Sequence, residues 1–98
     1  MNIQIIADNL ILSAGNRLLI DEKINFHLEK LLSHYSEEQK IASVKVTKDK
    51  LDKYTINFDM NLSGKKNIYA NATHILFESA LVDLIDAVEK QIKKLKEN

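Results

Sequence analysis

Residues 74–98 read HILFESALVDLIDAVEKQIKKLKEN. The pattern of this stretch requires the rest of the chain to form a second layer against which it can pack. Its apolar residues recur at intervals of three and four, as along the buried face of an α-helix. They are Phe77, Leu81, Leu84, Ile85, Val88, Ile92 and Leu95. The opposite face carries Asp83 and Asp86 first and three lysines later, which are Lys90, Lys93 and Lys94. We predict one amphipathic helix whose apolar stripe packs on another layer.

That layer is predicted by sequence alternation upstream of the helix. In residues 54–62, YTINFDMNL, every second residue is apolar, which is typical of a strand with one buried face. Residues 2–7, 41–48 and 65–72 resemble further strands. Ser63 and Gly64 predict a tight hairpin turn, because glycine can take the positive φ that such turns require.

A second helix is predicted over residues 16–35, after a loop at residues 8–15. Helical spacing links Ile20, Ile24, Leu28, Leu31 and Tyr35. Residues 36–39 then have the form of a short capping box. The order β-α-β-β-β-α predicts an α+β two-layer sandwich, with a four-stranded sheet and two helices packed on one face. We expect the first two strands to be parallel and the others to form an antiparallel meander.

Composition bounds the protein class. The length of 98 residues is that of one domain, which we expect to span residues 1–98. Fourteen basic and fourteen acidic residues cancel, so the whole molecule exerts no general attraction on nucleic acid. The lack of cysteine excludes disulfides and thiol catalysis. Without a long apolar run or a signal-peptide pattern, we expect a cytoplasmic protein that does not enter membranes.

Candidate catalytic residues are few. His27 and His34 lie about 10.5 Å apart along a helix axis, too far to share a metal ion. His74 stands alone, and Asp59 has only amide neighbours. An enzyme acting at Asp59 or His74 is the weakest alternative, because neither residue has a partner group for acid–base catalysis. We expect no catalytic site, metal, cofactor or small-molecule substrate.

Charge on the first helix is more informative. Lys23, His27, Lys30 and His34 line one flank of its apolar stripe at spacings of four, three and four. Such a basic edge can follow a phosphate backbone, although a merely solvated flank has the same pattern. If this flank faces the last helix, it forms a basic channel with the lysines there. The sequence does not fix which flank faces inward.

A rival interpretation uses apolar residues. Leu19 and Phe26 are predicted to project away from the core stripe, and Val82 lies on the exposed face of the last helix. These residues would suit a protein partner or a second copy of the chain, with the charges serving solubility. Nucleic acid is not expected on the sheet, because only Tyr69, between Asn67 and Asn71, is aromatic there and the element order is not that of an RNA-recognition motif.

The chain resembles a known bacterial family in its element order, its length and its last helix. The matching residues of that helix are Ala80, Leu81, Asp83, Leu84, Ile85, Val88, Glu89, Lys90, Gln91, Ile92 and Lys94, with a weaker match around residues 28–31. The family is that of ribosome hibernation-promoting factors and ribosome-associated inhibitors, also called the sigma-54 modulation or protein Y family. The chain resembles its short form, without the further domain or acidic tail of other members.

This resemblance implies a ribosome hibernation factor that inhibits translation under stress or in stationary phase. It implies binding to the small ribosomal subunit and its ribosomal RNA near the decoding channel, by a protein that is monomeric off the ribosome. Lys30, Lys90 and Lys94 match basic family positions, and the charge pattern adds Lys23, His27 and Lys93 to the expected RNA-binding residues. The chain departs from the family at Glu78, within a usual Asp-Met-Tyr-like run, and at Ala87, where a lysine is usual.

Overall fold

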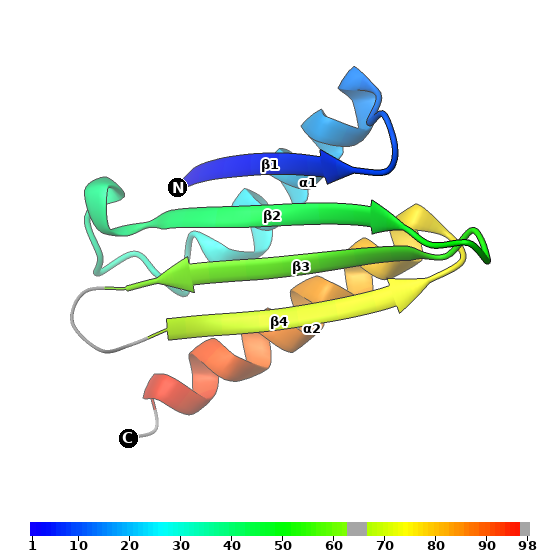
Figure 1. Cartoon of the computed structure of the whole chain (residues 1–98). Coiled ribbons are helices and arrows are strands. Elements are labelled where there is room, and N and C mark those ends of the chain that lie inside the picture. Colours follow the sequence, from blue (N-terminus) through cyan, green and yellow to red (C-terminus); the bar gives the residue numbers. More distant parts are fainter. Residues whose placement is uncertain (63–66, 97–98) are drawn as a thin grey trace.

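The computed structural model describes residues 1–62 and 67–96, and its elements follow the predicted order β-α-β-β-β-α (Figure 1). Strands β1 (Asn2–Asp8), β2 (Ile41–Lys48), β3 (Tyr54–Asn61) and β4 (Asn67–His74) form the sheet. Helices α1 (Ala14–Leu28) and α2 (Phe77–Lys96) both cover one face of it, and a short 3-10 turn, η1 (Glu37–Gln39), precedes β2. The predicted α+β sandwich is confirmed.

The four strands lie in the order of the sequence, β1-β2-β3-β4. β1 and β2 are parallel, with α1 as their crossover, and their register runs from Asn2 opposite Ile41 to Asp8 opposite Thr47. β3 is antiparallel to both β2 and β4. These pairings confirm the predicted topology. The hairpin expected at Ser63 and Gly64 lies outside the described residues.

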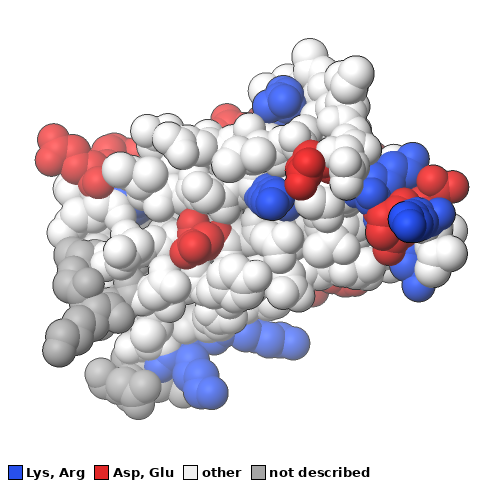
Figure 2. All heavy atoms as spheres, viewed as in Figure 1, with Lys and Arg blue, Asp and Glu red and all other residues white. Residues whose placement is uncertain are grey.

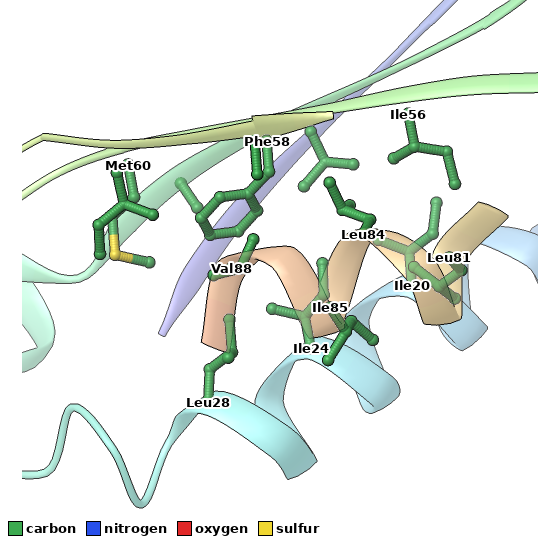
Figure 3. Packing of buried hydrophobic residues seen from close by; sticks show 14 of the residues in the cluster. Ile20, Ile24, Leu28, Ile56, Phe58, Met60, Leu81, Leu84, Ile85 and Val88 are labelled. Carbon is green, nitrogen blue, oxygen red and sulfur yellow. The ribbon is translucent and has the colours of Figure 1, made fainter. Parts of the chain in front are cut away.

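The core lies between the sheet and the helices. Phe58 of β3 is 0% exposed and stands at the centre of the sheet's inner face, opposite Val88 and Leu84 of α2 (Figure 3). Ile24 and Leu28 close the core from α1. The whole predicted apolar stripe of α2 is buried apart from Leu95, which is partly buried. The apolar face of the strands, with its period of two, and the apolar faces of the helices, with their period of 3.6, therefore pack together in one hydrophobic core, as the sequence predicted.

Helix α1 begins earlier and ends sooner than residues 16–35. Its start is set by Ser13, whose side chain accepts a hydrogen bond from the backbone N–H of Asn16 and caps the first turn. After Leu28 the chain tightens, because the N–H of Leu32 is shared between the carbonyls of Leu28 and Glu29. Leu32 is buried in the core as a result, a position that the helical spacing did not single out.

Helix α2 begins at Phe77, three residues later than predicted, because β4 continues to His74. The Nδ1 atom of His74 accepts a hydrogen bond of 3.0 Å from the N–H of Leu76, which turns the chain from strand to helix. His74 is therefore the last strand residue rather than the start of the helix. The capping box predicted at residues 36–39 is present in η1, where Ser36 and Gln39 bond reciprocally.

An ion cluster around the buried ammonium group of Lys40 ties η1 to the end of α1. Lys40 is only 3% exposed, and its ammonium group lies 3.0 Å from Glu29 and 2.9 Å from Glu37. The N-terminal ammonium group contacts the same two carboxylates. Hydrogen bonding by Lys40 lowers the pKa of Glu29, and hydrogen bonding by the N-terminus lowers the pKa of Glu37. The two acids pair with both cations, so neither buried ammonium group lacks a counter-charge.

The outer face of the sheet is open to solvent and mostly uncharged (Figure 2). Among the few charged residues on it, Lys45 lies 3.7 Å from Asp8. Tyr69 is 51% exposed there and donates a hydrogen bond to Asn57. The prediction of a single outward aromatic residue between amides is confirmed for β4. Among residues 1–62 and 67–96, this face shows no cluster of lysines of the kind that a phosphate backbone requires.

Candidate nucleic-acid interface

The two helices run in the same direction, side by side beneath the sheet (Figure 1). β1 and β4 point the same way, and each is followed by a helix that returns beneath the sheet. On α2 the acidic residues Glu78, Asp83 and Asp86 precede the lysines. On α1 the first turn holds Arg17 and no acidic residue, and His27 stands in the last turn. The parallel arrangement therefore places the basic end of α2 and the His27 end of α1 at the same end of the helical layer.

The inter-helix groove, named here for the hollow between α1 and α2, is lined by Leu19, Lys23 and His27 of α1. Leu81, Val82 and Ile85 of α2 form its apolar side, and its volume is about 120 Å³. The flank of α1 that carries Lys23 and His27 therefore faces α2, which answers the question that the sequence left open. Acidic residues, Glu78 and Asp86, stand on the α2 side of the groove.

His27 provides a direct polar contact between the helices. Its Nδ1 atom lies 3.3 Å from Oε1 of Glu89, and this contact becomes an ion pair when the imidazole is protonated. Glu89 belongs to the same side of α2 as Asp86, one turn before it, and Glu78, about two turns before Asp86. At the level of Lys23 and His27 the expected basic channel therefore has one basic and one acidic wall.

The lysines of α2 lie beyond that acidic wall. Lys90, Lys93 and Lys94 are all exposed. Lys94 lines a second hollow with Asn67 and Gln91, next to the edge of β4. Figure 2 shows basic side chains gathered at this edge of the molecule, where the C-terminal half of α2 extends past the sheet.

Lys30 and His34 lie past the last residue of α1. Lys30 is exposed, whereas the His34 ring rests against the Tyr35 ring with centroids 4.2 Å apart. Within residues 1–62 and 67–96, no ion pair involves Lys23, Lys30, Lys90 or Lys93. These four ammonium groups keep their charge available for an external anion.

A family model described as "Sigma 54 modulation protein / S30EA ribosomal protein" matches residues 3–98. The chain belongs to this family. The match covers nearly the whole sequence and identifies the hibernation-promoting factor family that the last helix indicated. Members are ribosome-associated proteins. Among curated proteins, none matches the sequence significantly.

Two solved structures show the same fold as this family member. A ribosomal subunit interface protein from Coxiella burnetii superposes with a TM-score of 0.76 at 21% identity, covering 100% of both chains. The N-terminal domain of Protein Y from Thermus thermophilus superposes with a TM-score of 0.78 at 21% identity, covering 97% of this chain and 99% of that domain.

The two departures from the family's usual residues lie in different surroundings. Glu78 is exposed and borders the inter-helix groove, where it contributes to the acidic wall. Ala87 is partly buried and packs against the hydrophobic core. A lysine at this position would have to extend its chain along the core surface to reach water. The basic charge of this family member is therefore concentrated in the last turns of α2.

Two residues that sequence reasoning missed protect the sheet edges. The amide group of Gln91 bonds both the N–H and the carbonyl of Tyr69 on the β4 edge. Arg17 reaches from α1 to the carbonyl of Ile5 on the β1 edge, at 3.4 Å. Covered edges resist pairing with other strands. No sequence signal predicts these bonds, because they depend on how each helix lies against the sheet.

The exposed apolar residues only partly match the sequence prediction. Phe26 is 77% exposed and Val82 is 55% exposed, as expected. Leu19, however, is partly buried and packs against the core at the rim of the inter-helix groove. It does not project away from the core, because this flank of α1 is the one that faces α2.

Other site classes find little support in the described part of the chain. Residues 1–62 and 67–96 contain no cluster of three His, Asp or Glu residues placed to hold a metal ion. None of the helices there has the length and apolarity needed to cross a bilayer. Asp59 lies exposed on the outer sheet face, and His74 is engaged by the Leu76 backbone.

Proposed function

We propose that this chain is a ribosome hibernation factor that binds the small ribosomal subunit near the decoding channel and inhibits translation under stress or in stationary phase. Membership of a ribosome-associated family supports this role. The observation that carries it is the alignment of α1 and α2, which brings the basic ends of both helices to the same end of the molecule. The proposed RNA-binding residues are Lys23, His27, Lys30, Lys90, Lys93 and Lys94.

The spacing of the groove contacts supports convergence of these residues. Lys23 and Asp86 line the same groove, and His27 pairs with Glu89. Lys30 follows just past α1, and the exposed Lys90 and Lys93 follow Glu89 on α2, in the same chain direction. Lys94 lies beside the edge of β4. This order along two parallel segments supports a basic surface across both helix ends.

In the proposed mechanism, the protein inhibits translation by occupying the sites where messenger and transfer RNA bind. Ammonium groups on a rigid helical layer neutralise phosphates of ribosomal RNA and release their counterions, which makes the affinity dependent on salt. The acidic first half of α2, with Glu78, Asp83 and Asp86, repels the same backbone, so the two ends of α2 are not equivalent. A protein held in this orientation excludes messenger and transfer RNA from the sites that it covers.

The remaining features of the proposal follow from this mechanism. A preformed protein surface can bind RNA without a catalytic group or a cofactor, so in this proposal the chain acts without enzymatic activity. Residues 1–98 act as one ribosome-binding domain in the cytoplasm, where ribosomes work, and the protein is monomeric when it is off the ribosome.

A second candidate function is supported by the inter-helix groove. Its apolar side and the exposed Val82 and Phe26 would suit a protein partner or a second copy. Size-exclusion chromatography at low and high salt separates the two functions. A stable dimer that is indifferent to salt favours the interaction module, and a monomer that elutes with small subunits favours hibernation.

The decisive experiment is competition on purified small ribosomal subunits. A labelled messenger RNA and an initiator transfer RNA are bound first, and the protein is then titrated. The wild-type protein should displace both RNAs, whereas K90E/K94E should not. The matched control is K50E/K53E, which makes the same change in net charge at the β2–β3 turn, on exposed residues at the opposite end of the molecule. Equal displacement by all three proteins would contradict the proposal.

A further inference from the structure

Phe26 is an exposed aromatic residue that the fold itself does not use. The apolar residues that face the core from α1, Ile20, Ile24 and Leu28, are all buried. Phe26 is 77% exposed and does not belong to the core cluster. Its large apolar surface therefore gains little from folding and remains available for a ligand.

The ring of Phe26 is held in place although it is exposed. It meets the imidazole of His27 edge-on, with ring centroids 5.1 Å apart and planes at 85°. His27 is in turn held by Glu89 on α2, with Nδ1 and Oε1 3.3 Å apart. This chain of contacts limits the movement of the phenyl ring, and the edge-on geometry leaves at least one of its faces open. A ring fixed in advance loses less conformational entropy when it binds.

Two lysines flank the ring along the chain. Lys23 precedes Phe26 by three residues and Lys30 follows it by four, so each lies about one helical turn away. The helical turn continues past Leu28, because the N–H of Leu32 bonds back to the Leu28 carbonyl. Both lysines are exposed and, among the described residues, form no ion pair. An open aromatic face between two cations matches the alternation of base and phosphate in a nucleic acid strand.

We propose that Phe26 stacks on an unpaired base of the bound RNA while Lys23 and Lys30 contact the phosphates on either side. This inference rests on the proposed RNA-binding function and specifies the conformation of the RNA at this point. A base inside an A-form duplex has both faces covered by its neighbours, whereas a base in a loop or bulge can stack on a side chain. The site therefore selects a loop, bulge or single strand and reads no sequence, because every base offers a π-face.

The test uses wild type, F26A and F26W with a fluorescein-labelled single-stranded RNA, an RNA duplex of equal length and purified small ribosomal subunits. F26A should weaken binding to the single strand and to the subunits about five- to a hundred-fold and leave duplex binding unchanged. The slope of affinity against salt should stay the same, since no charge is lost. Thermal unfolding of F26A should match wild type, because the side chain is exposed.

F26W gives a direct signal, because the chain contains no other tryptophan. Its fluorescence should be quenched on binding the single strand, and its affinity should equal or exceed that of wild type. If F26A binds as tightly as wild type, or if Trp fluorescence is unchanged in the complex, the stacking proposal is wrong. If F26A loses subunit binding while F26W shows no quenching by RNA, Phe26 contacts a ribosomal protein instead. Failure of wild type itself to bind RNA would refute the proposed function rather than the role of Phe26 alone.

Discussion

His27 of α1 and Glu89 of α2 face each other across the inter-helix groove, with 3.3 Å between Nδ1 and Oε1. This pair marks the level at which α2 changes from acidic to basic. Before it lie Asp86 and Glu78 on α2, and after it lie Lys90, Lys93 and Lys94. Glu89 is the last acidic residue in the described part of α2, so it borders the proposed RNA surface and competes with phosphate for His27.

Removing that carboxylate should strengthen RNA binding. E89Q keeps the size and hydrogen-bonding capacity of the side chain and removes one negative charge beside His27. A charge contact at the surface contributes about 0.2–1 kcal/mol, so affinity for small subunits should rise by about 1.4- to five-fold. Fluorescence anisotropy with labelled protein measures the change. E38Q, an exposed acid in η1, is the control and should bind as wild type does; an equal gain in both variants would show a general charge effect only.

Replacing two phenylalanines by alanine should affect stability very differently, because Phe58 is buried in the core and Phe26 is exposed. Phe58 is 0% exposed at the centre of the sheet, so F58A should cost about 3–5 kcal/mol in the free energy of unfolding. The loss includes both the buried surface and the cavity that remains. F26A removes the same number of atoms from an exposed ring and should leave stability nearly unchanged. Urea denaturation of both variants checks the assignment of the core, which fails if the two curves coincide.

The cluster around Lys40 predicts a loss of stability in acid. The pKa values of Glu29 and Glu37 are lowered below 4.5 in the folded protein by hydrogen bonds from Lys40 and the N-terminus. Lowered carboxyl pKa values contribute stability that is complete above the unfolded-state value and is lost as the pH falls through the folded-state value. E29Q should therefore unfold at a lower temperature than wild type at pH 7, and the difference should shrink below about pH 4.

E38Q serves again as the matched control for this measurement, because Glu38 is exposed on the same short turn and lies outside the cluster. Its unfolding temperature should follow wild type at every pH. If the difference in unfolding temperature between E29Q and wild type stays constant from pH 7 to pH 3, the cluster does not titrate as described.

The sequence predicted the sheet and the buried face of α2 because both depend on regular periods. Every second residue from Tyr54 to Leu62 faces inward, and each apolar residue of the α2 stripe is buried or partly buried. The ends of α1 were predicted less well, because Ser13 caps it early and the shared bonding of Leu32 tightens the chain after Leu28. Helical spacing alone continues through these residues and cannot show where the helix stops.

The candidate site was predictable in its residues but not in its arrangement. The basic flank of α1 and the basic end of α2 are visible as local charge patterns. Which flank of α1 faces α2 depends on the rotation of that helix, and this rotation determines that Glu78, Asp86 and Glu89 stand opposite Lys23 and His27. The edge contacts of Gln91 and Arg17 depend on tertiary packing in the same way. Contacts between elements distant in sequence leave no periodic signal in either element.

The most direct test of the account is the salt dependence of binding to small ribosomal subunits. If about four to six phosphates are neutralised, the logarithm of the association constant should fall with the logarithm of salt concentration with a slope of about −3 to −5. K90E/K94E should bind weakly and flatten that slope by about 1.4 to 1.8, whereas K50E/K53E should keep the wild-type slope. A wild-type slope near zero, or equal slopes for all three proteins, would contradict the claim that the aligned basic ends of α1 and α2 bind ribosomal RNA.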